Sequence, residues 1–304
     1  GPLTKKRMET ADEEFLAAAL KFIDKAEKSK KPFFVWFNST RMHVWTRLKP
    51  ESQGVTGQGL YADGMAEHDG HVGQLLAKLD ELGITDNTIV MYSTDNGAEL
   101  ALWPDGGYTP YRGEKNSNWE GGYRVPMMVR WPDGIKAGQG SNEIIAMMDW
   151  MPTLLAAAGE QDIKGRLLKG TRIGDKDYKV HLDGYNFLPY FTGETDKGPR
   201  KEFVYSSDTG DIVGYRYGDW KLVFKEQRAH GLQVWQDPYT TLRMPKIFNL
   251  RMDPFERMDH EGSGYDQWMG EHMFLFAPAM AEVVKFKATF KDYPQRQKPG
   301  SFVP

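Results

Sequence analysis

The sequence predicts an α/β protein in which helices flank a mixed or parallel sheet, followed by a smaller α+β part with an antiparallel sheet and a helix. Between residues 32 and 93, an apolar run, a helical pattern and a second apolar run follow one another. This βαβ order favours two parallel strands. Beyond about residue 185, short apolar runs alternate with turn sequences, which is typical of an antiparallel meander. We therefore expect a core-domain portion over residues 1–185 and a C-terminal subdomain over 186–304.

The first part is predicted from apolar periodicity and capping signals. Thr10 and Glu13 have the spacing of a capping box, and apolar residues follow at helical intervals. Short, continuous apolar runs indicate buried strands, and Gly83 is a typical residue after a helix end. The predicted elements are a helix over 10–29, a strand over 32–37, a helix over 61–82, and strands over 88–93 and 125–131.

The remaining elements follow from turn sequences and one further cap. Asp149 is placed to cap a helix that ends near Ala158, before Gly159. The sequences DTG and YGD separate short runs rich in β-branched and aromatic residues. We expect strands over 202–207, 211–218, 219–225 and 246–250, and a helix over about 274–291 that packs on this sheet.

Composition excludes several classes of function. The 304 residues carry a net charge of −3 without a basic block, which argues against nucleic acid or an anionic membrane as a partner. No apolar run approaches the roughly 18 residues that span a bilayer. The chain has no cysteine, so it contains no disulfide, thiolate metal site or cysteine nucleophile.

The stretch IVMYSTDNGAEL ends a predicted strand with hard oxygen ligands. Asp95 and Asn96 lie two and three residues beyond Ser93, and His43 lies six residues beyond Phe37. Ligands bind beyond the carboxyl ends of parallel strands, so we expect both groups at one sheet edge. A carboxylate and an amide oxygen suit Ca²⁺ or Mg²⁺, although two ligands do not complete a site. The alternative is a simple Asn–Gly turn at the end of a strand.

Other candidate residues also have structural alternatives. Lys115, in a glycine-flanked loop, could place a positive charge on an oxyanion, or could be a solvated loop lysine. His43 could protonate a leaving oxygen, or could be an ordinary loop residue. His68 and His71 share a helix face and are expected to be surface or partner residues. Glu120 and Arg124 are expected to form a structural ion pair. The aromatic loop 226–245 is either packed on the surface or lines a substrate pocket.

Five blocks in this order resemble the type I sulfatases of the alkaline-phosphatase-like superfamily, most closely bacterial arylsulfatases. They are FFVWFNSTRMH, DNTIVMYSTDNG, RGEKNSNWEGGYRVPMMVRWP, DWMPTLLAAAG and KIFNLRMDPFE. The resemblance implies a sulfuric ester hydrolase that acts on a sulfated small molecule or glycan, with a periplasmic or extracellular location. It implies Asp95 and Asn96 as ligands of Ca²⁺ or Mg²⁺, Lys115 as the sulfate-binding lysine, and His43 as a contact to the ester or its leaving oxygen.

The family nucleophile is formylglycine, made from a Cys or Ser in a Cys/Ser-x-Pro-x-Arg motif that this chain does not contain. The chain resembles the C-terminal half to two-thirds of a sulfatase, so a missing N-terminal portion or chain is an expected partner. We expect the 304 residues alone to bind Ca²⁺ poorly and to be inactive. The alternatives are a phosphate or phosphonate monoester hydrolase of the same superfamily, or an inactive truncated module.

Overall fold

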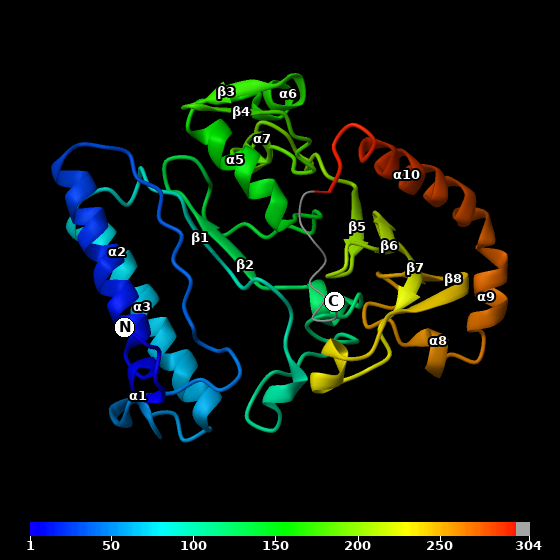
Figure 1. Ribbon diagram of the computed structural model, residues 1–304, viewed down its shortest axis with the longest axis horizontal. Coiled ribbons are helices and arrows are strands. Elements are labelled where there is room, and N and C mark those ends of the chain that lie inside the picture. Colours follow the sequence, from blue (N-terminus) through cyan, green and yellow to red (C-terminus); the bar gives the residue numbers. More distant parts are fainter. Residues whose placement is uncertain (296–304) are drawn as a thin grey trace. The chain divides into compact units, whose positions relative to one another are not determined.

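A computed structural model describes residues 1–295, which form two compact units (Figure 1). The first unit comprises residues 1–92, 99–108 and 128–133, and the second comprises 93–98, 109–127 and the chain from 134 onward. The observed elements confirm the predicted α/β class. The division after residue 185 stays a prediction, and residues 296–304 of that predicted C-terminal subdomain lie outside the described residues.

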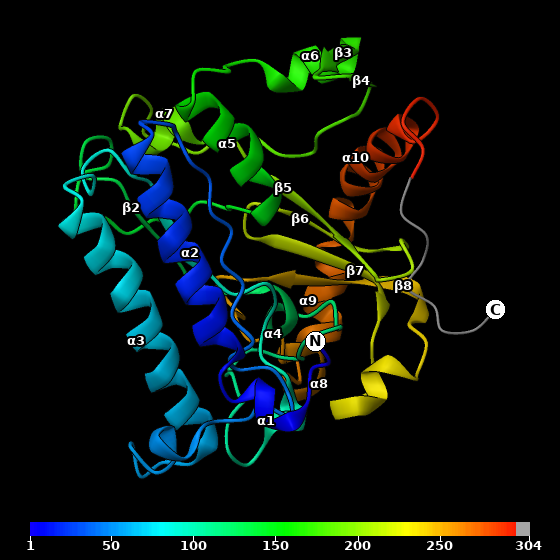
Figure 2. The ribbon, with the colours of Figure 1, turned by 60° about the vertical axis from the view of Figure 1, so that its left-hand side comes forward.

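Two long helices dominate the first unit and confirm both helix predictions. Helix α2 (Ala11–Lys28) and helix α3 (Leu60–Glu81) lie side by side (Figure 2). Leu16 and Ile23 on α2, and Leu79 on α3, are buried, as expected for apolar stripes that repeat every three to four residues. The short elements are α1 (Lys5–Met8), η1 (Pro50–Ser52) and η2 (Leu100–Leu102).

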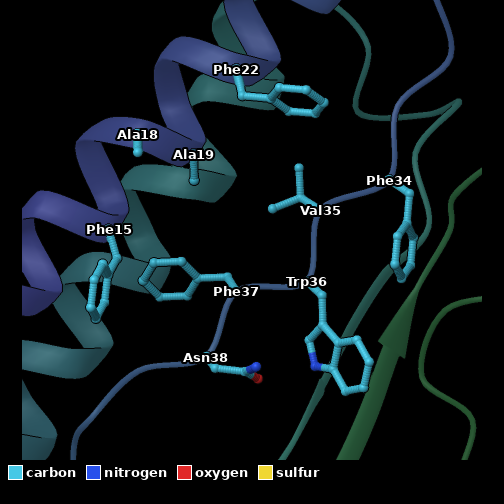
Figure 3. A pocket seen from close by; sticks show the side chains of 9 residues that line it. All are labelled: Phe15, Ala18, Ala19, Phe22, Phe34, Val35, Trp36, Phe37 and Asn38. Carbon is cyan, nitrogen blue, oxygen red and sulfur yellow. The ribbon is translucent and has the colours of Figure 1, made fainter.

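The strand predicted over residues 32–37 is wrong. This segment is extended but has no strand partner among the described residues. Val35 and Phe37 point toward α2 and help line an apolar pocket of about 520 Å³ (Figure 3). Phe34 and Trp36 also line this pocket, but they extend away from α2 and are 68% and 78% exposed. The apolar run therefore packs one face on a helix and leaves the other face uncovered.

Two later apolar runs do form strands, close to their predicted positions. Strand β1 (Val90–Ser93) and strand β2 (Met127–Arg130) are hydrogen-bonded neighbours in a two-stranded sheet. Asp95 and Asn96 follow β1 after the single residue Thr94, so the sequence placed these two residues correctly near a strand end. Among residues 1–295, no helix is both long and apolar enough to cross a membrane.

The predicted antiparallel meander is confirmed in the second unit. Its sheet has the order β5 (Glu202–Ser206), β6 (Ile212–Tyr217), β7 (Trp220–Glu226) and β8 (Thr240–Asn249). In its register, Leu222 pairs with Tyr215 on one side and Ile247 on the other. Helix α10 (Phe276–Thr289) packs Ala279 and Val283 onto Tyr215 and Leu222 of this sheet.

The second unit also holds short elements that the sequence did not indicate. A hairpin of β3 and β4 follows two helices, and further helices lie between β8 and α10 (Figure 1). They are α4 (Glu120–Tyr123), η3 (Met147–Asp149), α6 (Ile163–Lys169), β3 (Thr171–Ile173), β4 (Lys176–Tyr178), α7 (Leu188–Phe191), η4 (Gly231–Trp235), α8 (Met258–Glu261), α9 (Tyr265–Glu271) and η5 (Met273–Leu275). Helix α5 (Trp150–Ala157), in contrast, confirms the helix predicted to end near Ala158.

Asp149 precedes α5 as predicted, but its side chain does not cap that helix. The buried carboxylate instead forms an ion pair with Arg200 at 2.6 Å. It also accepts hydrogen bonds from the backbone N–H groups of Ala146 and Tyr185. A charge buried in this way is stable only when its oxygens are paired, so Asp149 joins segments that are distant in the sequence.

Candidate functional site

The turn that carries His43 is fixed by a buried aspartate. Asp12, at the start of α2, accepts hydrogen bonds from the Ser39 hydroxyl at 2.7 Å and the Thr40 N–H at 2.9 Å. The buried guanidinium of Arg41 lies 3.7 Å from Asp12 and 2.6 Å from Glu67. Burial raises the pKa of Asp12, but these hydrogen bonds and Arg41 outweigh it and hold the pKa below its usual value.

His43 itself is exposed at the surface of the first unit. Its Nδ1 lies 3.2 Å from the carbonyl oxygen of Val44. A carbonyl only accepts, so this contact places a proton on Nδ1 and leaves Nε2 for an outside partner. That arrangement suits the predicted contact with an ester oxygen, because a neutral ring offers an acceptor there and a protonated ring a donor.

The prediction for the two helix histidines is wrong for His71. Its side chain is buried at 4% exposure, and Nδ1 has no hydrogen-bond partner among the described residues. His68 is half-buried beside Tyr92, and burial lowers its pKa. The two rings therefore belong to the packing of α3. The described residues include no cluster of three or more His, Cys, Asp or Glu that could hold a metal.

Asp95 and Asn96 present oxygen atoms that no cationic side chain of the described residues neutralises. Asp95 is exposed, and within residues 1–295 no cationic side chain pairs with it. Its Oδ1 has only a weak contact with the hydroxyl of Thr94, at 3.4 Å. The amide nitrogen of Asn96 donates to the Gly97 carbonyl at 2.7 Å, which leaves the amide oxygen free of that bond. Both oxygens thus suit a hard cation.

Gly97 is required by close packing against a second loop. A Cβ at this position would lie 1.8 Å from the carbonyl oxygen of Gly121. The Gly97 N–H donates to the Gly122 carbonyl at 2.9 Å, so the two backbones run in contact. A Cβ on Gly121 would likewise meet the Arg112 carbonyl at 2.5 Å. The two loops therefore meet through backbone atoms that leave no room for a Cβ at Gly97 or Gly121.

The same pair of loops positions Lys115. Its N–H donates to the Ala98 carbonyl at 2.8 Å. Asp95 lies three residues before Ala98, so its Cα is at most about 11 Å from that of Ala98. The half-buried Lys115 side chain forms no ion pair with any carboxylate of the described chain. An ammonium without a protein counterion is available to an external anion.

Glu120, five residues after Lys115, belongs to a buried cluster of charged side chains. The ammonium of Lys221, which has no exposed surface, lies 3.0 Å from Glu120 and 2.7 Å from Glu256. Glu256 also accepts the Glu120 N–H at 2.6 Å. The predicted ion pair between Glu120 and Arg124 is confirmed at 2.7 Å.

The two carboxyl groups of the cluster have pKa values shifted in opposite directions. Burial raises the pKa of Glu120, but Lys221 and the two arginines Arg124 and Arg216 lower it to about 2. Burial and the neighbouring Glu120 raise the pKa of Glu256, although Lys221 opposes this. The cluster therefore holds the start of α4, and with it the glycines that contact Gly97, by strong interactions.

The structure brings three of the four predicted site residues into one unit. Asp95, Asn96 and Lys115 lie on two hydrogen-bonded loops of the second unit. His43 belongs to the first unit, so its role beside them stays a prediction. Sequence reasoning missed the cluster at Lys221 because buried charges and exposed charges look alike in a sequence.

Comparison with known proteins identifies relatives of the chain. Residues 2–160 match the Sulfatase family. The chain is 29% identical to N-acetylgalactosamine-6-sulfatase of Canis lupus familiaris, covering 80% of this chain and 47% of the relative. It is 31% identical to the steryl-sulfatase of Mus musculus, covering 75% of this chain and 38% of the relative. The chain thus spans about half or less of the length of these relatives.

The chain also shares its fold with solved structures. The structure of the PsFucS1 sulfatase from Pseudoalteromonas sp. superposes with a TM-score of 0.80 and 28% identity, over 97% of this chain and 56% of that one. The structure of Ps i-CgsB shares the fold, with a TM-score of 0.68, at 24% identity. It covers 96% of this chain and 56% of that chain.

Proposed function

Because the chain belongs to the sulfatase family, we propose that it supplies the sulfate-binding part of a sulfate monoester hydrolase. The observation that carries this proposal is the pair of backbone contacts that joins the Asp95–Gly97 loop to the Lys115 loop. These contacts place two uncompensated oxygen ligands and one uncompensated ammonium on adjoining backbone. A divalent cation and an ammonium are the groups that stabilise charge on a tetrahedral anion.

The family implies a metal ion and a formylglycine residue. The donor chemistry of Asp95 and Asn96 fits a hard cation, and we propose Ca²⁺, with Mg²⁺ as the alternative, as the ion that they help to bind. Bound there, the ion would supply positive charge for the sulfate oxygens. No residue of this chain fits formylglycine, because it has no cysteine and no serine followed by Pro-x-Arg in the required spacing. We therefore derive no nucleophilic step.

The described residues suggest a division of roles. Lys115 would neutralise a sulfate oxygen, and the metal ligands would hold a second charge beside it. From the family resemblance alone, we propose that His43 donates a proton to, or hydrogen-bonds, the ester oxygen of the leaving group. The family resemblance supports a periplasmic or extracellular location and a sulfated small molecule or glycan as substrate.

Sulfate binding tests this proposal. We expect inorganic sulfate, titrated by calorimetry, to bind the wild-type protein, and Lys115→Ala to weaken that binding about tenfold, because one charge-assisted contact contributes roughly 1.5 kcal/mol. Lys136→Ala, which removes an exposed loop lysine of the same unit, is the control and should change nothing. Equal affinity in the wild type and Lys115→Ala would refute the role of Lys115.

Hydrolysis distinguishes the proposed activity from its rivals. We expect the 304 residues alone not to hydrolyse an aryl sulfate, because the nucleophile is not among them. Clear Ca²⁺-dependent turnover would contradict this. Binding of inorganic phosphate without binding of sulfate would instead favour a phosphate monoester hydrolase.

A further inference from the structure

An exposed tryptophan stands beside the proposed sulfate-binding lysine. The Nζ atom of Lys115 lies 5.8 Å from the centroid of the Trp235 ring. Trp235 ends the short helix η4, and 44% of its surface is exposed. This distance is near the outer limit of a cation–π contact, so the ring does not satisfy the ammonium by itself. A large aromatic ring open to water beside an uncompensated charge is typical of a ligand-binding surface.

The position of this ring is fixed by hydrogen bonds between its segment and the Lys115 loop. The Gly231 N–H donates to the buried carboxylate of Glu114 at 2.8 Å. The side-chain amide of Asn116 donates to the Val234 carbonyl at 2.8 Å. Residues 114 and 116 thus flank Lys115, and their partners 231 and 234 lie just before Trp235.

Two further side chains, those of Tyr239 and Gln227, add hydrogen bonds to these two segments. The hydroxyl of Tyr239 donates to the Asn116 carbonyl at 3.2 Å. The buried side chain of Gln227 donates to the carbonyls of Val234 and Asp237. The aromatic loop 226–245 is therefore packed, in line with one of its two predicted roles, yet it still presents Trp235 outward.

We propose that Trp235 is a specificity-determining residue that binds the ring to which the sulfate is esterified. The inference rests on the proposed function, because it takes Lys115 as the sulfate ligand. The ammonium lies 5.8 Å from the indole centroid, so the ring of a sulfate ester held at Lys115 can reach the indole face. An indole face binds a six-membered ring with a flat apolar face, and both an aryl ring and a sugar ring offer one.

The experiment compares sulfate esters that differ only in the esterified group. Calorimetry measures the dissociation constants of methyl sulfate, phenyl sulfate and galactose 6-sulfate for the wild type, Trp235→Ala and Trp235→Phe. We expect Trp235→Ala to weaken binding of a ring-bearing ester roughly two- to tenfold, the range of one aromatic contact. Methyl sulfate should bind unchanged, and Trp235→Phe should restore most of the loss.

Matched variants separate the possible outcomes. Leu232→Ala, an exposed apolar residue on the same short helix, controls for disturbance of η4 and should bind every ester as the wild type does. A loss confined to phenyl sulfate identifies an aryl ester, and a loss confined to galactose 6-sulfate identifies a sugar ester. Equal losses for all three esters, or none, overturn the inference while sulfate binding at Lys115 stands. If no ester binds the wild type, the proposed function fails as well.

Discussion

Gly97 has no side chain because the carbonyl oxygen of Gly121 occupies the place where a Cβ would lie. A simple Asn–Gly turn was one of the two interpretations of this stretch. The φ angle of Gly97 is not in the left-handed region, so the requirement is contact with another loop and not an unusual turn. A single atom therefore decides whether the loop after β1 can reach the loop that carries Lys115.

Replacing Gly97 by alanine should separate the two loops. The new Cβ would meet a backbone carbonyl that cannot rotate away, so we expect the free energy of unfolding to fall by about 1–3 kcal/mol. Sulfate affinity should fall with it. Gly140→Ala, in open space in the same unit, is the control and should change neither quantity. Urea unfolding and sulfate calorimetry measure both effects, and unchanged sulfate affinity in Gly97→Ala would contradict the coupling.

The sequence was informative where a residue type restricts its own surroundings. Asp95 and Asn96 could be placed near a strand end because an apolar run stops just before them and Asp, Asn and Gly are uncommon inside strands. Their role as metal ligands stays a prediction. Trp235 could not be assigned, since it meets Lys115 only through a hydrogen-bonded loop more than a hundred residues away. His71 was misplaced because a histidine on a helix face carries no signal of whether that face is covered.

At the scale of secondary structure, strand β7 carries two lysines with very different environments. Lys221 is fully buried between Glu120 and Glu256. Lys225 pairs with Asp211 at 2.8 Å, where both side chains are partly exposed to solvent. We expect Lys221→Met to lower the free energy of unfolding by about 3–5 kcal/mol, because it removes the cationic partner of the buried Glu256, while Glu120 keeps Arg124.

The matched variant Lys225→Met should lower the free energy of unfolding by no more than about 1 kcal/mol, because it removes only an exposed ion pair. Urea unfolding of both variants gives the comparison. Similar losses for the two variants would mean that the buried cluster does not stabilise the second unit beyond an ordinary surface pair.

The buried cluster around Lys221 implies that the free energy of unfolding depends on pH in the acidic range. Glu120 has its pKa lowered from 4.5 to about 2, so its contribution is present above about pH 4.5 and is lost as the pH falls toward 2. The loss amounts to at most about 3 kcal/mol. Glu120→Gln should therefore flatten the fall in unfolding free energy between pH 5 and 3, as measured by urea unfolding at each pH.

Glu256 serves as a control because its pKa is shifted in the direction opposite to that of Glu120. Its pKa is raised, so its contribution is present below pH 4.5 and is lost as the pH rises through its folded value. Removing that titration with Glu256→Gln should make the acid-induced fall steeper. The same slope in both variants would show that the two carboxyl groups do not titrate in opposite directions.

Strand predictions succeeded where each run had a partner within the chain. The runs in the 202–226 region pair with one another through short turns, so local sequence was sufficient. The run over 32–37 has the same apolar character but gains no ladder among the described residues. Pairing depends on a neighbouring strand, and apolar sequence alone cannot supply that neighbour.

For the whole molecule, the number of metal ligands sets a limit on Ca²⁺ affinity. Ca²⁺ takes six to eight oxygen ligands, and only Asp95 and Asn96 of this chain are proposed to bind it. We expect a dissociation constant of about 1 mM or weaker, so about 1 mM Ca²⁺ should stabilise the chain by no more than about 0.4 kcal/mol. Thermal unfolding with Ca²⁺ and with a chelator measures this. A large stabilisation that Asp95→Asn abolishes would show a complete site.

The central claim is that a sulfate group binds where the Asp95–Gly97 loop meets the loop of Lys115. A crystal structure of the protein grown with sulfate and Ca²⁺ tests it most directly. We predict a tetrahedral anion within hydrogen-bond distance of Lys115 Nζ, with the cation on the Asp95 carboxylate. An ordered sulfate bound elsewhere, with Lys115 and Asp95 contacting only solvent, would contradict the claim.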